Sequence, residues 1–87
     1  MYKEKVTLKN ETGLHARPAS LFVKEAARFT SGITVIKDDK EYNAKSIMGI
    51  LSMGAGKGDT ILIQAEGSDA EEAVKALVKL VDDNFNE

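Results

Sequence analysis

The one histidine of the chain is the side chain best suited to chemistry. His15 lies where loop-forming residues give way to helix-forming ones, between Gly13 and Pro18. Neutral imidazole is a nitrogen nucleophile near physiological pH, because its reference pKa is about 6.5. It can attack a phosphoryl group and later release it, since an N-phosphoryl imidazole is labile. The residue type therefore favours a phosphate relay over a permanent modification.

The neighbours of His15 favour an anion at this position. The first N–H groups of a helix lack intrahelical partners, and the helix dipole adds a positive potential there. Arg17 adds a permanently charged guanidinium whose planar fork matches phosphate oxygens. The same residues also fit a structural role, with His15 as a surface or capping residue and Arg17 as a solvated charge. The residues alone leave both interpretations open.

Ser46 is a second candidate site for phosphate. It precedes a short apolar segment, 47–52, and is predicted to be the N-cap of a short helix. A phosphoserine there would carry about −1.5 to −2 charge at pH 7, which a helix N-terminus tolerates. Its effect would fall on partners, by repelling acidic surfaces or attracting arginines. Ser46 also fits a role as a cap alone.

The segment that follows Ser46 predicts a small contact surface. So short a helix cannot turn all of its large apolar side chains inward, and exposed apolar patches usually mark contact sites. The residues expected to form this surface are Ile47, Met48 and Leu51, together with Ser20 and Lys24 from the preceding helix. A relay must release its partners, so the interface should not exceed about 1,200 Å². The alternative, that most of these apolar residues belong to the core, stays open.

The hydrophobic pattern predicts seven elements in the order β-α-β-β-α-β-α. The expected ranges are strand 2–8, helix 16–28, strands 32–37 and 40–43 joined by an Asp-Asp turn, helix 47–52, strand 60–66 and helix 69–84. Ser68 and Glu71 have capping-box spacing, which predicts Ser68 as the N-cap of the last helix. Strands and helices that are each apolar on one side predict an α+β fold, with helices packed on one face of an antiparallel sheet.

Composition excludes several classes of protein. The 87 residues suffice for one domain, 1–87. No cysteine and one histidine exclude disulfides, thiol catalysis and multi-histidine zinc sites. A net charge of −2 argues against a dedicated nucleic-acid binder. No signal peptide or membrane-spanning segment is recognisable, so a cytoplasmic location is expected.

The glycine spacing at 49–54 resembles the start of a phosphate-binding P-loop. Ala55 and Gly56 stand where that motif requires Lys and Ser or Thr, and a strand follows instead of a helix. Nucleotide binding is therefore rejected. The later glycines are expected to serve turns.

Two segments resemble the HPr family, the histidine-containing phosphocarriers of the bacterial sugar phosphotransferase system. The first is Thr-Gly-Leu-His-Ala-Arg-Pro-Ala at 12–19, which resembles the active-site motif. The second is Lys-Ser-Ile-Met-Gly-Ile-Leu-Ser-Met-Gly-Ala at 45–55, which resembles the segment with the regulatory serine. The resemblance covers the whole chain, and Thr12 and Ala16 are similar to the low-GC Gram-positive branch.

The resemblance implies a fold, a reaction and a site. The fold would be an open-faced β-sandwich, with four antiparallel strands covered on one face by three helices. His15 would accept phosphate from Enzyme I and pass it to sugar-specific IIA proteins. Arg17 would support the phosphohistidine, with Thr12 and the backbone of Ala16 near the phosphate. The resemblance implies no cofactor, and a monomer is expected.

The resemblance also implies regulation at Ser46. An HPr kinase/phosphorylase would phosphorylate Ser46, which would weaken transfer from Enzyme I and promote binding to a catabolite-control repressor. The alternative is a regulatory HPr paralogue that acts mainly as a Ser46-phosphorylated partner of a repressor. Such regulatory paralogues replace the active-site histidine, so the presence of His15 favours the carrier. The sugar, the IIA partner and the reactive ring nitrogen stay open.

Overall fold

The computed structural model describes residues 1–86 and contains the predicted series of elements. These are β1 (Tyr2–Thr7), α1 (Ala16–Ala27), β2 (Gly32–Lys37), β3 (Lys40–Asn43), α2 (Ile47–Ser52), β4 (Thr60–Glu66) and α3 (Ala70–Asp82), followed by a short turn, η1 (Asn84–Asn86). The order β-α-β-β-α-β-α is confirmed. The turn η1 was not predicted.

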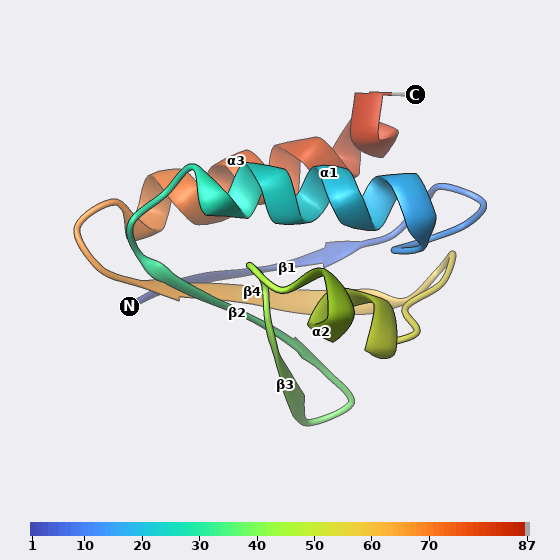
Figure 1. The fold of residues 1–87 in the computed structure, drawn as a ribbon, viewed down its shortest axis with the longest axis horizontal. Coiled ribbons are helices and arrows are strands. Elements are labelled where there is room, and N and C mark those ends of the chain that lie inside the picture. The colour runs from blue at the N-terminus through green and yellow to red at the C-terminus, as the bar shows by residue number, and fades with distance from the viewer. Residues whose placement is uncertain (87) are drawn as a thin grey trace.

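The four strands form one antiparallel sheet in the order β1-β4-β2-β3. The helices lie over one face of this sheet, with α1 and α3 side by side, and the other face is uncovered (Figure 1). The predicted α+β, open-faced β-sandwich is therefore confirmed. β4 pairs with both β1 and β2, so the last strand in the sequence lies in the middle of the sheet.

Side chains along each strand point alternately toward the core and toward the open face of the sheet. In β4, Ile61, Ile63 and Ala65 are buried under the helices, while Leu62 and Gln64 lie on the open face. The two long helices close the core with the apolar stripes that the 3.6-residue period predicts. Their buried residues include Ala19, Phe22 and Ala26 of α1 and Ala73, Val74, Leu77 and Val81 of α3.

The β2–β3 connection is a tight hairpin turn, as predicted. Asp38 and Asp39 have φ angles of 53° and 68°. This left-handed backbone at both positions joins antiparallel strands with the right twist, and Asp tolerates it.

The start of α3 differs from the prediction. Asp69, and not Ser68, is the N-cap, and no side chain caps the helix. The carboxylate of Asp69 accepts hydrogen bonds from the backbone N–H groups of Thr30 and Ser31, both at 3.0 Å, and from the Ser31 hydroxyl. The prediction of a Ser68–Glu71 capping box was therefore wrong. Asp69 takes the N-cap position, but its carboxylate binds the connection between α1 and β2 and does not cap its own helix.

The end of α3 also differs. The predicted helix runs to residue 84, but α3 ends at Asp82 and the backbone turns left-handed at Asn84, Phe85 and Asn86, with φ angles of 51°, 56° and 65°. This turn places the Phe85 side chain in the core with no exposed surface, where η1 contacts α1 and α3. Burial of the ring offsets the cost of the unfavourable backbone.

Candidate functional site

The loop that carries His15 is fastened to the loop between α2 and β4. The N–H of Leu8 donates to the Asp59 carbonyl at 2.9 Å, and the N–H of Gly58 donates to the Leu8 carbonyl at 2.8 Å. Nearer the histidine, the N–H of Leu14 donates to the Ala55 carbonyl at 3.0 Å. Leu14 itself is buried. The two loops therefore form one rigid support below His15.

Two further contacts fix the conformation of the loop. Gly13 has a φ of 61°, and a Cβ there would lie on the carbonyl oxygen of Ala55 and 2.6 Å from the Cα of Gly56. The buried amide of Asn10 donates from Nδ2 to the Gly13 carbonyl at 2.9 Å and to the Thr12 hydroxyl at 3.4 Å. Only glycine fits at position 13, because the position needs both a left-handed backbone and a close approach to the other loop.

His15 is the N-cap of α1, with an extended backbone at φ −128° and ψ 152°. Its side chain is exposed and makes no capping hydrogen bond. The ring is therefore free to react. Ala16 follows in the first helical position with a φ of 43°, a left-handed conformation that is strained for a residue with a side chain. The N–H groups of Ala16 and Arg17 open the helix, and Pro18 contributes none.

Arg17 is exposed in the first turn of α1, and within residues 1–86 it forms no ion pair. The spacing of Arg17, Ser20 and Lys24 places all three on one face of the helix. Ser20 is half-buried and Lys24 is exposed. The structure therefore brings together His15, Arg17 and the backbone of Ala16, with Thr12 exposed on the adjoining loop.

Ser46 is the N-cap of α2, as predicted. Its Oγ accepts a hydrogen bond from the N–H of Gly49 at 3.0 Å, and its side chain is half-buried. Lys45 donates from Nζ to the carbonyl oxygen of Phe29 at 2.7 Å, just beyond the end of α1. This contact ties the start of α2 to the end of α1, and no local pattern indicated it.

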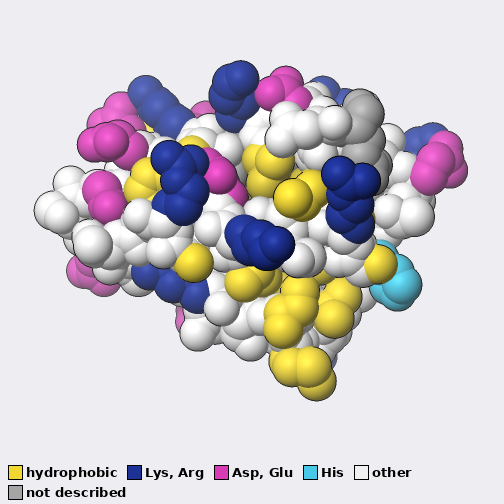
Figure 2. Space-filling model, turned by 45° about the horizontal axis from the view of Figure 1, so that its top comes forward, with side chains coloured by type: hydrophobic (Ala, Val, Ile, Leu, Met, Phe, Trp, Pro, Cys, Tyr) yellow, Lys and Arg dark blue, Asp and Glu magenta, His cyan; other side chains and the backbone are white. Residues whose placement is uncertain are grey.

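The short helix α2 divides its apolar residues between core and surface. Ile50 and the following Met53 are buried. Ile47, Met48 and Leu51 have exposed fractions of 40%, 74% and 37%. Figure 2 shows a hydrophobic patch over this helix, Lys and Arg side chains across the same face, and His15 at one end of it. Binding by these residues stays a prediction.

The described part of the chain has neither a cluster of metal ligands nor a membrane-spanning helix. Residues 1–86 contain no group of three or more His, Cys, Asp or Glu side chains placed to hold a metal ion. No helix of this part has the length and apolar character needed to cross a membrane.

Comparison with known families decides the classification. Residues 2–83 match the family described as PTS HPr component phosphorylation site. The chain belongs to the HPr family. The HPr-like protein Crh of Halalkalibacterium halodurans is 51% identical over 82 residues, which are 94% of this chain and 98% of Crh. The phosphocarrier protein HPr of Mycoplasma capricolum is 46% identical over 77 residues, which are 88% of this chain and 86% of that HPr.

Solved structures of the HPr family agree on the fold. HPr-C-His from Thermoanaerobacter tengcongensis has a TM-score of 0.98 and 54% identity, and covers 100% of this chain and 98% of its own. A structure of the HPr dimer from the same organism has a TM-score of 0.81, 54% identity and full coverage of both chains. Crh of Bacillus subtilis, described as a swapped, intertwined dimer, has a TM-score of 0.77, 45% identity and 97% coverage of both chains. Some HPr-family members are thus dimers.

Proposed function

We propose that this HPr-family protein is a phosphocarrier in which His15 accepts a phosphoryl group from phosphorylated Enzyme I and passes it to IIA proteins. The observation that carries the proposal is the free, exposed imidazole of His15 at the N-terminus of a twelve-residue helix. The relatives named HPr and Crh share the fold, and the presence of the histidine favours the carrier over a regulatory paralogue.

The transfer needs little beyond positioning and charge stabilisation. The lone pair of one ring nitrogen attacks phosphorus, an N–P bond forms, and the bond from phosphorus to the donor breaks with its electron pair. The N–H groups of Ala16 and Arg17 and the Arg17 guanidinium stabilise the phosphoryl oxygens. Attack by a nucleophile of IIA on the same phosphorus breaks the N–P bond and returns neutral imidazole.

The face that carries His15 is proposed to bind both donors and acceptors. Arg17 and Lys24 supply unpaired positive charge along α1. Ile47, Met48 and Leu51 supply an exposed apolar patch beside it. A surface of this kind fits acidic partners that have an apolar centre, and its small size permits rapid release. The carrier is proposed to engage one partner at a time as a monomer.

Ser46 is proposed as a regulatory phosphorylation site for an HPr kinase/phosphorylase. A dianion on the Ser46 side chain would lie directly beside the exposed α2 patch, so it would weaken binding of Enzyme I. The same group would create a site for a catabolite-control repressor. The Crh relatives favour this second role, which is compatible with the first in one chain.

The test is intact-mass analysis after incubation with phosphoenolpyruvate, magnesium and Enzyme I. We expect a gain of one phosphate that is labile in acid and stable in base, and that is lost to an added IIA protein. His15→Ala should gain nothing while keeping the native circular dichroism spectrum. Ser46→Ala, which keeps His15, should still gain the acid-labile phosphate.

Two results would count against the carrier. A folded wild-type protein that gains no phosphate beside an active control HPr would leave only the Ser46 role. A His15→Ala protein that still relays phosphate to IIA would place the acceptor elsewhere.

A further inference from the structure

Asn10 is a buried polar side chain that the phosphate transfer described above does not use. It is 7% exposed, and Ser31, the other buried polar residue of the described chain, bonds with Asp69. The Oδ1 atom of Asn10 is buried and has no hydrogen-bond partner within residues 1–86. An unpaired buried amide oxygen costs stability, so the stability of the fold alone does not explain an amide at this position.

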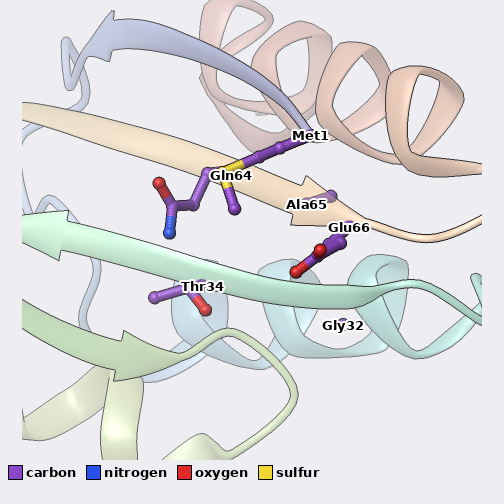
Figure 3. A pocket seen from close by; sticks show the side chains of 6 residues that line it. All are labelled: Met1, Gly32, Thr34, Gln64, Ala65 and Glu66. Carbon is purple, nitrogen blue, oxygen red and sulfur yellow. The ribbon is translucent and has the colours of Figure 1, made fainter.

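The hollow beside Asn10 differs from a hollow on the sheet. On the open face, a hollow of about 410 Å³ is lined by Thr34, Gln64 and Glu66, none of which is buried (Figure 3). At the loop before α1, a hollow of about 350 Å³ is lined by Asn10 and Thr12 together with three further residues. Of these two hollows, only the second combines a buried amide with an exposed hydroxyl.

The amide group of Asn10 is held in one orientation. Residues 10–13 form a tight turn, in which the N–H of Gly13 donates to the Asn10 carbonyl at 3.2 Å. Across the same turn, Nδ2 of Asn10 donates to the Gly13 carbonyl at 2.9 Å. Turning the amide over would place Oδ1 against this carbonyl, so that two acceptors would face each other. The other hydrogen of Nδ2 is therefore available to the Thr12 hydroxyl oxygen, which lies 3.4 Å from the nitrogen.

This contact determines which way the Thr12 hydroxyl hydrogen points. Because Oγ1 of Thr12 accepts from Asn10, its own hydrogen is left for another acceptor. Thr12 is exposed and lies three residues before His15 on the same loop. We propose that Asn10 is a positioning residue for phosphate transfer, which turns the Thr12 hydroxyl so that it donates to the phosphoryl group on His15. This role rests on the proposed phosphocarrier function and adds to it a buried residue that no partner protein contacts.

A double-mutant cycle of Asn10→Ala and Thr12→Val tests this role, with transfer from Enzyme I measured by rapid quench. We expect Asn10→Ala alone to lower kcat about three- to tenfold, the value of one hydrogen bond, and less than about 1.5-fold in the Thr12→Val background. KM should stay constant, because a buried amide does not contact Enzyme I. Asn43→Ala removes an amide that accepts the Lys45 N–H at 2.9 Å, and should leave kcat unchanged.

A purely structural role of Asn10 gives a different result. If the amide only holds the loop through the Gly13 carbonyl, Asn10→Ala slows transfer equally in both backgrounds, and that result would overturn the proposal. An Asn10→Ala protein as fast as wild type would do the same. Asn10→Asp keeps the shape of the side chain and replaces Asn10→Ala if that variant does not fold. An ionised carboxylate only accepts, so it would draw the Thr12 hydrogen toward itself, and its effect should again depend on Thr12.

Chemical phosphorylation gives a second readout that does not need Enzyme I. Phosphoramidate transfers its phosphoryl group to an imidazole nitrogen with loss of ammonia, and the phosphorus NMR shift then reports hydrogen bonds to the phosphoryl oxygens. We expect Asn10→Ala to move the shift of phosphorylated His15 in the presence of the Thr12 hydroxyl and not in the Thr12→Val background. Equal changes in both backgrounds, or none in either, would overturn the role of Asn10. A wild-type protein that Enzyme I fails to phosphorylate would refute the carrier instead, and the phosphorus shifts would still decide the role of Asn10.

Discussion

Gly13 lies against the carbonyl oxygen of Ala55, and there is no room between them for a side chain. We expect Gly13→Ala to cost at least about 1–2 kcal/mol of unfolding free energy from its left-handed backbone alone. The clash should add to this and displace the His15 loop. Gly54→Ala is the matched control, because Gly54 has a similar φ of 65° with open space around it. Urea unfolding and the rate of His15 phosphorylation measure both effects. Equal losses in the two variants would contradict the importance of the Gly13 contact.

Arg17 should matter for the phosphate and not for the fold. We expect Arg17→Ala to slow phosphate acceptance roughly 10- to 100-fold, the value of a charge-assisted hydrogen bond of about 1.5–3 kcal/mol. Arg28→Ala removes the same residue type from the far end of α1, where it pairs with Glu25 at 2.7 Å, and should leave the rate unchanged. Rapid-quench transfer from Enzyme I gives both rates. Equal slowing in both variants would indicate a general charge effect in place of a local one.

Two substitutions at Ser46 should separate its structural role from its regulatory one. Ser46→Ala removes the bond to the Gly49 N–H and should cost about 1 kcal/mol of unfolding free energy without slowing transfer. Ser46→Asp keeps a good N-cap but adds negative charge, so its stability should be near wild type while transfer from Enzyme I slows. Urea midpoints and transfer rates are compared for the pair. Slowing by Ser46→Ala as well would assign the effect to α2 conformation.

Asp69 should make stability depend on pH in the acid range. Hydrogen bonds, first from the Ser31 hydroxyl and then from the Thr30 backbone, lower the pKa of Asp69 from 3.8 to about 2. The ionised carboxylate is bound more tightly in the folded state, so its contribution is complete above pH 3.8 and is lost as pH falls toward 2. The urea midpoints of wild type and Asp69→Asn should therefore differ near neutral pH and converge in acid. Asp82→Asn, whose carboxylate lies in an exposed pair with Lys9, should track wild type throughout.

Phe85 should contribute more to the free energy of unfolding than its place near the chain end indicates. Because its ring is fully buried, we expect Phe85→Ala to cost about 3–5 kcal/mol of unfolding free energy. Phe29→Ala should cost clearly less, since that ring is only half-buried. Thermal and urea unfolding give both values. A loss at Phe85 no larger than that at Phe29 would mean that η1 is not anchored in solution.

Local sequence patterns predicted most of this fold because most of its signals are local. The stripe through Ala19, Phe22 and Ala26, the turn at Asp38 and the cap at Ser46 all depend on neighbours within a few residues. The features that were predicted wrongly or not at all depend on contacts with residues that are distant in the sequence. Asp69 is held by Ser31, 38 residues away, so the local capping box gave the wrong residue. Phe85 stands among Asn and acidic residues and resembles a solvated tail until the gap between α1 and α3 is known.

The same difference between local signals and distant contacts explains how much of the site could be predicted from the sequence. The positions of His15 and Arg17 at a helix start follow from Pro18 and the helical spacing. The support below them does not, because the contact of Gly13 with Ala55 joins two loops that are far apart in sequence. The bond from Lys45 to the Phe29 carbonyl is of the same kind. The spacing of residues in the sequence predicts which side chain reacts. The packing of the two loops determines how firmly that side chain is held.

The central position of β4 has a consequence for synthesis on the ribosome. β1 emerges first but pairs only with β4, which is also the strand that holds β2 against it. The exit tunnel encloses the most recently joined residues, so β4 is free to pair only after the residues that follow Glu66 have been added. β1 therefore stays unpaired while α1, β2, β3 and α2 are made, and only the β2–β3 hairpin of the sheet can form in that time. A product of premature termination before residue 60 leaves β1 without a partner and β2 paired only with β3, so its strand edges are open to proteases.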